Sequence, residues 1–214
     1  MYTYTYLILL LLIFIFSFLG VRACSSYAPS KIKFIGYIIY IMFFLRISTL
    51  ILYLLAPSIR YLYLFKPIYF LNFLYIPITA VISLYILSRN DKFKITFVFI
   101  LAAVFSLAYG LTIYEFKARV CAQNSYGYIM NLYGYDYFAW IYIILNTIFM
   151  IFSILVILKK GTNKIGVFLV FASAVVTIAE SLFKYIGSAV FPETVISELI
   201  WIVSITYVIC RLKK

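Results

Sequence analysis

The sequence predicts an all-α integral membrane protein, folded as one bundle of seven transmembrane helices. Of its 214 residues, 67% are hydrophobic and only 11% are charged, whereas a soluble domain has about 25% charged residues. Several apolar runs approach or exceed the ~20 residues that cross a bilayer. Basic residues collect mainly on one side of these runs, as the topology of membrane proteins requires. We therefore expect residues 1–214 to form a single transmembrane domain, with no room for a separate soluble one.

The predicted spans follow one another through short connections. They cover residues 4–21, 34–56, 68–87, 95–114, 137–158, 165–186 and 194–210. The first has almost no polar residue after Thr5, and a signal peptide is the alternative interpretation. It lacks the basic n-region of a signal peptide, however. Pro77 in the third span removes a backbone donor and predicts a kink. The turn at residues 187–193 is short, so the sixth and seventh helices are expected to be antiparallel neighbours.

The distribution of Lys and Arg predicts the orientation of the bundle. One side receives twelve basic residues at positions 22, 31, 33, 89, 92, 94, 159, 160, 164, 211, 213 and 214. The other side receives four, at positions 60, 66, 117 and 119. Because basic loops stay in the cytoplasm, the N-terminus is predicted outside and the C-terminus inside. Removal of the first span by cleavage would turn the basic side outward, which is why it is retained as a helix.

The longest polar segment, residues 115–136, is predicted to lie at the outer end. Its second half alternates aromatic and small residues, with tyrosines at positions 126, 128, 133 and 135. Such a pattern fits either a short hairpin or a flap at the membrane surface. Tyrosine prefers the headgroup region, and this favours an interfacial loop or flap.

A few charged and polar side chains fall inside the predicted spans. Ser173, Thr177, Glu180 and Lys184 share one helical face, because their spacings are four, three and four. Charged residues inside a membrane usually face the bundle interior and have a partner. From their depths we expect Arg46 to pair with Glu180, and Lys184 with Glu198. The candidate ligand- or ion-binding residues are Arg46, Glu180, Lys184, Glu198, Thr177, Asn146 and Asn72.

These residues also allow a purely structural interpretation. Two internal ion pairs would fix the register of the helices without binding anything. Lys184 could extend its ammonium to the interface without a partner, and isolated Asn, Ser and Thr residues in membrane helices commonly bond across helices as packing contacts.

The composition excludes several functional classes and leaves three, of which an intramembrane enzyme ranks last. The chain has no histidine and three cysteines that are far apart, and it contains no phosphate-binding loop or nucleophile motif. We therefore expect no catalytic residue, metal site or cofactor. The net charge of +12 is dispersed between apolar runs, which argues against nucleic acid as a partner.

We expect a non-enzymatic protein that acts through a protein partner in the membrane, as a sensor, an adaptor or an accessory subunit of a membrane complex. The alternative is a small solute or ion transporter that uses the Arg46, Glu180, Lys184 and Glu198 side chains. Besides the lipid bilayer and a protein, a small molecule or an ion is thus the further partner considered. The expected location is the cell (plasma) membrane.

Overall fold

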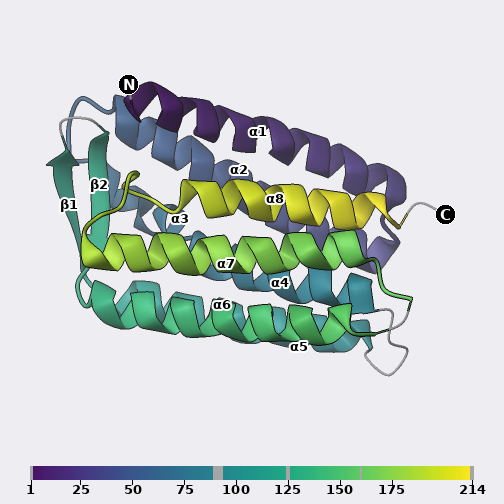
Figure 1. Cartoon of the computed structure of the whole chain (residues 1–214). Coiled ribbons are helices and arrows are strands. Elements are labelled where there is room, and N and C mark those ends of the chain that lie inside the picture. The colour runs from purple at the N-terminus through teal and green to yellow at the C-terminus, as the bar shows by residue number, and fades with distance from the viewer. Residues whose placement is uncertain (1, 89–93, 124–125, 160, 213–214) are drawn as a thin grey trace.

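Seven helices lie side by side in the computed structural model, which describes residues 2–88, 94–123, 126–159 and 161–212 (Figure 1). Six apolar stretches are long enough to cross a membrane, and a seventh helix is shorter. The chain is therefore an all-α, multi-pass membrane protein by the length and composition of its helices. The helices of the bundle are α1 (Tyr2–Tyr27), α2 (Ser30–Leu55), α4 (Asn72–Ser88), α5 (Ile95–Glu115), α6 (Tyr135–Ile157), α7 (Lys164–Ile186) and α8 (Val195–Cys210).

The third apolar stretch, Leu62–Ser88, is an interrupted helix. It begins with the 3-10 turn η1 (Leu62–Phe65), continues as the short helix α3 (Lys66–Tyr69) and resumes as α4. The interruption falls between α3 and α4, and α4 runs on through Pro77. The discontinuity thus lies before the proline where the sequence predicted a kink. It leaves Tyr69 at the end of a short helix, beside the centre of the bundle.

The two termini lie at opposite ends of the bundle (Figure 1). The N-terminus is at the end that carries the small β-hairpin, and α8 carries the chain to the other end. The last turns of α1, α4 and α6 and the first turns of α2, α5 and α7 lie at the same end as the C-terminus. Described basic residues at that end are Arg22, Lys31, Lys33, Lys94, Lys159, Lys164 and Arg211. Arg89, Lys92, Lys160, Lys213 and Lys214 belong to the same predicted group but lie outside the described residues.

The segment at residues 115–136 contains an antiparallel hairpin of β1 (Ala118–Gln123) and β2 (Gly127–Leu132). Ala118 pairs with Leu132, and Gln123 pairs with Gly127 at the turn. Gly127 has a φ of +72°, and a Cβ there would lie 2.6 Å from the Tyr53 carbonyl oxygen. Only glycine fits both the left-handed backbone and this close approach to the end of α2. Of the two conformations considered for this segment, the hairpin is the one formed; its position on a membrane surface stays a prediction.

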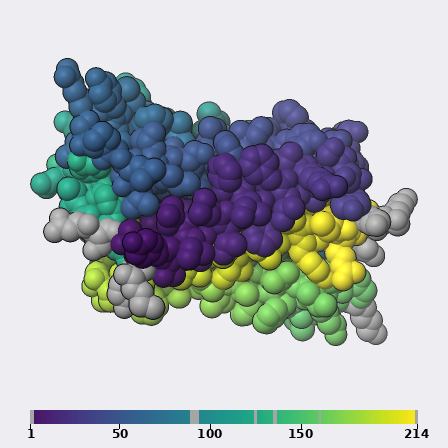
Figure 2. Space-filling view, turned by 90° about the horizontal axis from the view of Figure 1, so that it is seen from above, coloured from purple at the N-terminus to yellow at the C-terminus, as the bar shows by residue number. Residues whose placement is uncertain are grey.

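The helices differ in how much of their surface is buried. In Figure 2, α1 lies beside α2 and next to α8 along one side of the molecule. Gly20 of α1 allows the ring of Tyr40 on α2 to pack directly on its backbone. Trp201 and Arg46 are the largest side chains that are fully buried. By contrast, Val98 is the one buried residue within α5. The centre of the bundle therefore lies between α2, α4, α7 and α8, where the charged side chains meet.

Candidate functional site: an intramembrane charge network

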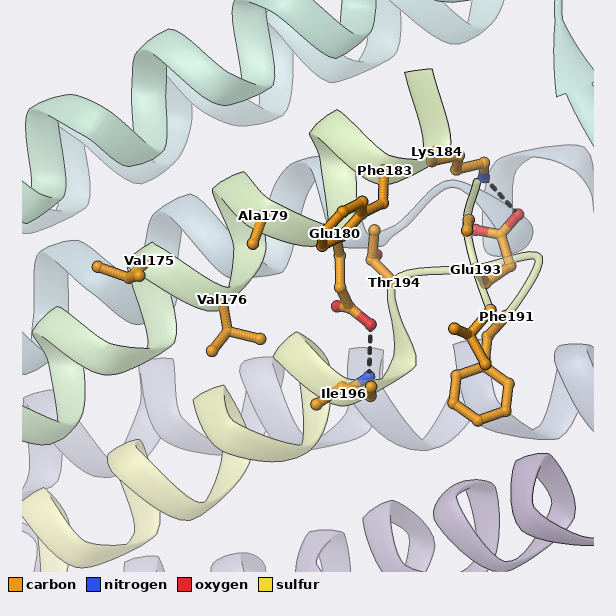
Figure 3. Close-up of a pocket in the computed structure, with 12 residues that line it drawn as sticks. Val175, Val176, Ala179, Glu180, Phe183, Lys184, Phe191, Glu193, Thr194 and Ile196 are labelled. Carbon is orange, nitrogen blue, oxygen red and sulfur yellow. Dashed lines mark hydrogen bonds and ion pairs between the residues drawn. The ribbon is translucent and has the colours of Figure 1, made fainter. Parts of the chain in front are cut away.

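The connection between α7 and α8 starts at the surface, where residues 187–190 are exposed, and then enters the bundle at residues 191–194. Gly187 ends α7 with a φ of +79°, and its N–H donates to the Lys184 carbonyl oxygen at 3.2 Å. The Glu180 carboxylate accepts backbone hydrogen bonds from Ile196 at 3.1 Å and Ser197 at 2.8 Å, both in the first turn of α8 (Figure 3). Glu180 precedes the end of α7 by six residues, or about 9 Å. The N-terminus of α8 therefore begins well below the end of α7.

Arg46 on α2 lies at the centre of the network. Its Nε donates to Glu198 Oε1 at 3.0 Å, and its Nη2 donates to Glu193 Oε2 at 3.1 Å. Arg46 and Glu198 have no exposed surface at all, and the Glu193 side chain is 4% exposed. One guanidinium thus joins α2 to the first turn of α8 and to the segment that precedes it. Its planar group of donors suits two carboxylates at once, which a lysine ammonium would not.

Each of the two carboxylates has further donors. Glu193 Oε1 accepts from the Tyr69 hydroxyl at 2.9 Å and from Lys184 Nζ at 2.9 Å. Glu198 Oε2 accepts from the Tyr75 hydroxyl at 2.6 Å. The interruption between α3 and α4 brings both tyrosines to the network, because Tyr69 ends α3 and Tyr75 lies in the first turns of α4. All four carboxylate oxygens are therefore satisfied by the protein.

Arg46, Lys184, Glu193 and Glu198 form a group with no net charge. Taking charges out of water carries a large penalty, which mutual attraction offsets only where geometry is good and the remaining lone pairs are filled. The carboxylate lone pairs are filled here, whereas the Nη1 atom of Arg46 is buried and has no partner among the described residues. The arrangement ties α2, α3, α4, α7 and α8 together at one level of the bundle.

The structure contradicts both predicted ion pairs. Arg46 pairs with Glu193 and Glu198 instead of Glu180, and Lys184 pairs with Glu193 instead of Glu198. The prediction assumed that α8 starts at the outer surface, which would put Glu198 level with Lys184. Because the connection descends into the bundle, Glu198 reaches the level of Arg46, and Glu180 is left to cap α8.

Sequence reasoning missed Glu193, the residue that both cations share. It was assigned to the surface turn at residues 187–193. Its position just before an apolar helix could have indicated a role at the start of that helix, because acidic residues are favourable near a helix N-terminus. Tyr69 and Tyr75 carried no such signal, since 22 tyrosines occur in the chain.

The remaining predicted polar residues are buried but stand apart from the ion pairs. Thr177 accepts a hydrogen bond from Trp201 Nε1 at 2.9 Å and so links α7 to α8. Asn146 on α6 donates to the Tyr142 carbonyl oxygen of its own helix at 2.8 Å. Asn72 lies at the start of α4, near Glu193. The Oδ1 atoms of Asn146 and Asn72 have no partner among the described residues.

Two hollows border the Lys184–Glu193 ion pair. The larger, of about 300 Å³, is an open groove between α7 and the segment that leads into α8 (Figure 3). The smaller, of about 20 Å³, has space for one or two waters. Lys184, Glu193 and Thr194 line both. The groove is otherwise apolar apart from Glu180, and its walls are formed by Val175, Val176, Ala179, Phe183, Ala189, Val190, Phe191 and Ile196.

Beyond the smaller hollow, one face of α4 carries further polar atoms. Asn72, Thr79 and Ser83 are spaced seven and four residues apart, so they share that face. The side-chain oxygens of all three are buried and have no partner in the described part of the chain. Buried polar groups of this kind are normally satisfied by water or a ligand.

The chemistry available to this site is charge pairing and hydrogen bonding. Among the described residues, no three His, Cys, Asp or Glu side chains are grouped so as to hold a metal ion. No protein-family model, curated protein or solved structure matches the chain.

Proposed function

We propose that this chain is a non-enzymatic sensor that acts through a protein partner in the membrane. One observation carries the proposal: the segment 187–194 touches five other elements through specific contacts. Glu193 binds Arg46 of α2, Tyr69 of α3 and Lys184 of α7. A shift of this one segment would therefore alter the contacts of several helices at once.

The same segment also contacts the hairpin and the first helix. The Tyr126 hydroxyl of the hairpin donates to the Val190 carbonyl oxygen at 2.9 Å. Phe191 packs against Tyr6 of α1, with ring centroids 5.9 Å apart, and Tyr6 meets Tyr126 edge to face at 5.5 Å. An event at the hairpin thus has a contiguous physical route to the buried ion pairs. Such a route supports a relay only if the segment has two arrangements.

The proposed orientation follows the charge distribution. The end that carries the hairpin would face the outside, and the basic end would face the cytoplasm. The N-terminus would then be external, the C-terminus cytoplasmic, and the membrane that of the cell surface. In this orientation the hairpin is the part of the sensor that a signal would reach first.

The test is recovery of a partner from native membranes. The tagged chain is cross-linked in the membrane, purified in mild detergent and compared with Tyr126→Phe, which removes one hydroxyl that contacts the segment. Tyr61→Phe is the matched control, because Tyr61 is 64% exposed. We expect the wild type and the control to recover a partner at the same fixed stoichiometry. With Tyr126→Phe, the amount of partner recovered should fall or rise about two- to tenfold, which is the change that loss of one neutral hydrogen bond allows. Recovery of the chain alone, or equal recovery with all three, would overturn the proposal.

A transporter is the second candidate, and the polar face of α4 favours it. Unpartnered oxygens of Asn72, Thr79 and Ser83 extend over about 16 Å of helix, starting beside the Lys184–Glu193 pair. Transporters commonly place such sites where helices are interrupted, and α3 and α4 are interrupted there. Proteoliposomes loaded with a pH-sensitive dye, or given ²²Na⁺, separate the candidates. Proton or sodium flux above that of empty liposomes, lost in Thr79→Ala, would favour the transporter over the sensor.

A further inference from the structure

The groove beside α7 contains one carboxylate more than the cations around it can neutralise. Glu180, Glu193 and Glu198 lie near one another with Arg46 and Lys184, which leaves an excess of one negative charge. Within the described part of the chain, the three ion pairs of the site all omit Glu180. Glu180 accepts hydrogen bonds from two backbone N–H groups of α8, but the N-terminus of a helix carries only about half a positive charge. Among the described residues, Glu180 is therefore the carboxylate of this group that pairs with neither cation.

A second polar group lies in the groove, the hydroxyl of Thr194. Thr194 is 6% exposed, and its Oγ1 has no hydrogen-bond partner among the described residues. In Figure 3 its side chain lies close to Glu180, in the segment that leads into α8. A carboxylate and a hydroxyl oxygen side by side can both accept hydrogen bonds. They form a site for a cation that carries N–H donors.

The rest of the groove is apolar and suits a hydrocarbon body. Val175 and Val176 lie about one turn below Glu180 on α7, and Phe183 and Ile196 border the opening. Val175, Phe183 and Ile196 are 38%, 55% and 37% exposed, so this wall faces outward and is reachable from the lipid. The groove of about 300 Å³ is at the lower limit of small-molecule sites.

From these features we infer that the groove binds a lipophilic ammonium ion, a protonated amine with an apolar tail. The ammonium donates to Glu180 and Thr194, and the tail lies on Val175 and Val176. A quaternary ammonium of the same length keeps the charge but lacks the N–H donors, so it binds less well. The inference extends the proposed sensor by naming the ligand class of the groove beside its relay segment.

The experiment measures binding of tritiated n-octylamine at neutral pH to the full chain in zwitterionic lipid nanodiscs, with empty nanodiscs subtracted. We expect saturable binding that unlabelled octylamine displaces, whereas octyltrimethylammonium displaces it less well and 1-octanol does not. Glu180→Gln keeps the shape of the side chain and should weaken binding about ten- to hundredfold, as loss of a charge-assisted hydrogen bond implies. Thr194→Ala should weaken it about three- to tenfold.

Glu115→Gln is the matched control, because it removes the same charge from an exposed position outside the groove. The control should bind octylamine like the wild type. If Glu115→Gln and Glu180→Gln lost octylamine binding equally, the binding would depend on the overall charge of the protein and not on the groove. This result would overturn the inference. Equal displacement by octanol would show that the groove holds lipid chains only. Binding needs no partner, so failure to recover a partner and failure to bind octylamine can be told apart.

Discussion

Helices α5 and α7 are similar in length and apolar character, yet they have opposite surroundings. Both are long and apolar enough to cross a membrane, with 21 and 23 residues. Val98 is the buried residue of α5, whereas α7 buries Gly166, Val167, Val170, Ser173, Ala174, Thr177 and Ser181. The buried face of α7 is therefore rich in small and hydroxyl side chains. This agrees with the view that small residues and hydrogen bonds, rather than apolar area, hold membrane helices together.

Small residues by themselves, however, do not decide whether a helix is buried. Helix α5 also carries Ala103, Ser106 and Gly110, and these face open space or are exposed. What α7 has in addition is Glu180, Lys184 and Thr177, whose polar atoms bond to α8 and its leading segment. Helix α5 also bonds to its neighbours, through the Tyr109 hydroxyl to the Pro67 carbonyl oxygen and through its Ile113 carbonyl oxygen to Lys66 Nζ, but these contacts are exposed or half-buried. The comparison indicates that polar bonds to the centre of the bundle, rather than polar bonds in general, accompany the burial of a helix.

The largest effect is expected from removing the central cation. Arg46→Ala leaves Glu193 and Glu198 without the guanidinium that joins them, and breaking a buried ion pair costs about 3–5 kcal/mol in soluble proteins. We expect thermal unfolding in one detergent to show a large loss of stability. Arg46→Lys should recover only part of it, because an ammonium cannot reproduce the planar two-carboxylate contact. If Arg46→Ala lowered the stability no more than Glu115→Ala on α5 does, the two regions would not differ in the way described.

A smaller effect is expected from adding one methyl group at two helical glycines. A Cβ at Gly20 would lie 2.0 Å from the Tyr40 ring, and a Cβ at Gly110 of α5 would meet nothing within 4 Å. Gly20→Ala should therefore lose about 1–3 kcal/mol through overpacking. Gly110→Ala should be neutral or gain up to about 1 kcal/mol from helix propensity. Unfolding in the same detergent measures both, and a clear loss in Gly110→Ala would mean that α5 packs against something in the purified protein.

The smallest effect is expected from the polar contact between α7 and α8. Trp201→Phe and Thr177→Val each remove the hydrogen bond from the indole N–H to the Thr177 hydroxyl. Interhelical hydrogen bonds in membrane proteins average about 0.6 kcal/mol. A double-mutant cycle should return a coupling of that order. Strict additivity would mean that the contact contributes packing alone and does not act as an anchor.

The sequence by itself determined the class and the order of the helices. Long apolar runs, too few charges for a water-exposed surface and basic residues at alternate connections are local properties, so they can be read residue by residue. For the same reason the predicted spans at residues 95–114 and 165–186 lie almost exactly on α5 and α7. The burial of Arg46, Asn72, Asn146, Thr177 and Glu198 also follows from the cost of placing polar groups in lipid.

Only the tertiary structure decided which of these charges meet. Pairing depends on the relative heights of helices that are far apart in sequence, and one local fact changed those heights. Residues 191–194 fold back into the bundle, so Glu193 lies beside Arg46 instead of in a surface turn, and Glu180 becomes the cap of α8. No spacing in the sequence reports this descent. It is stabilised by bonds to Arg46, Tyr69 and Lys184, residues from three other elements that come together only when the bundle is complete.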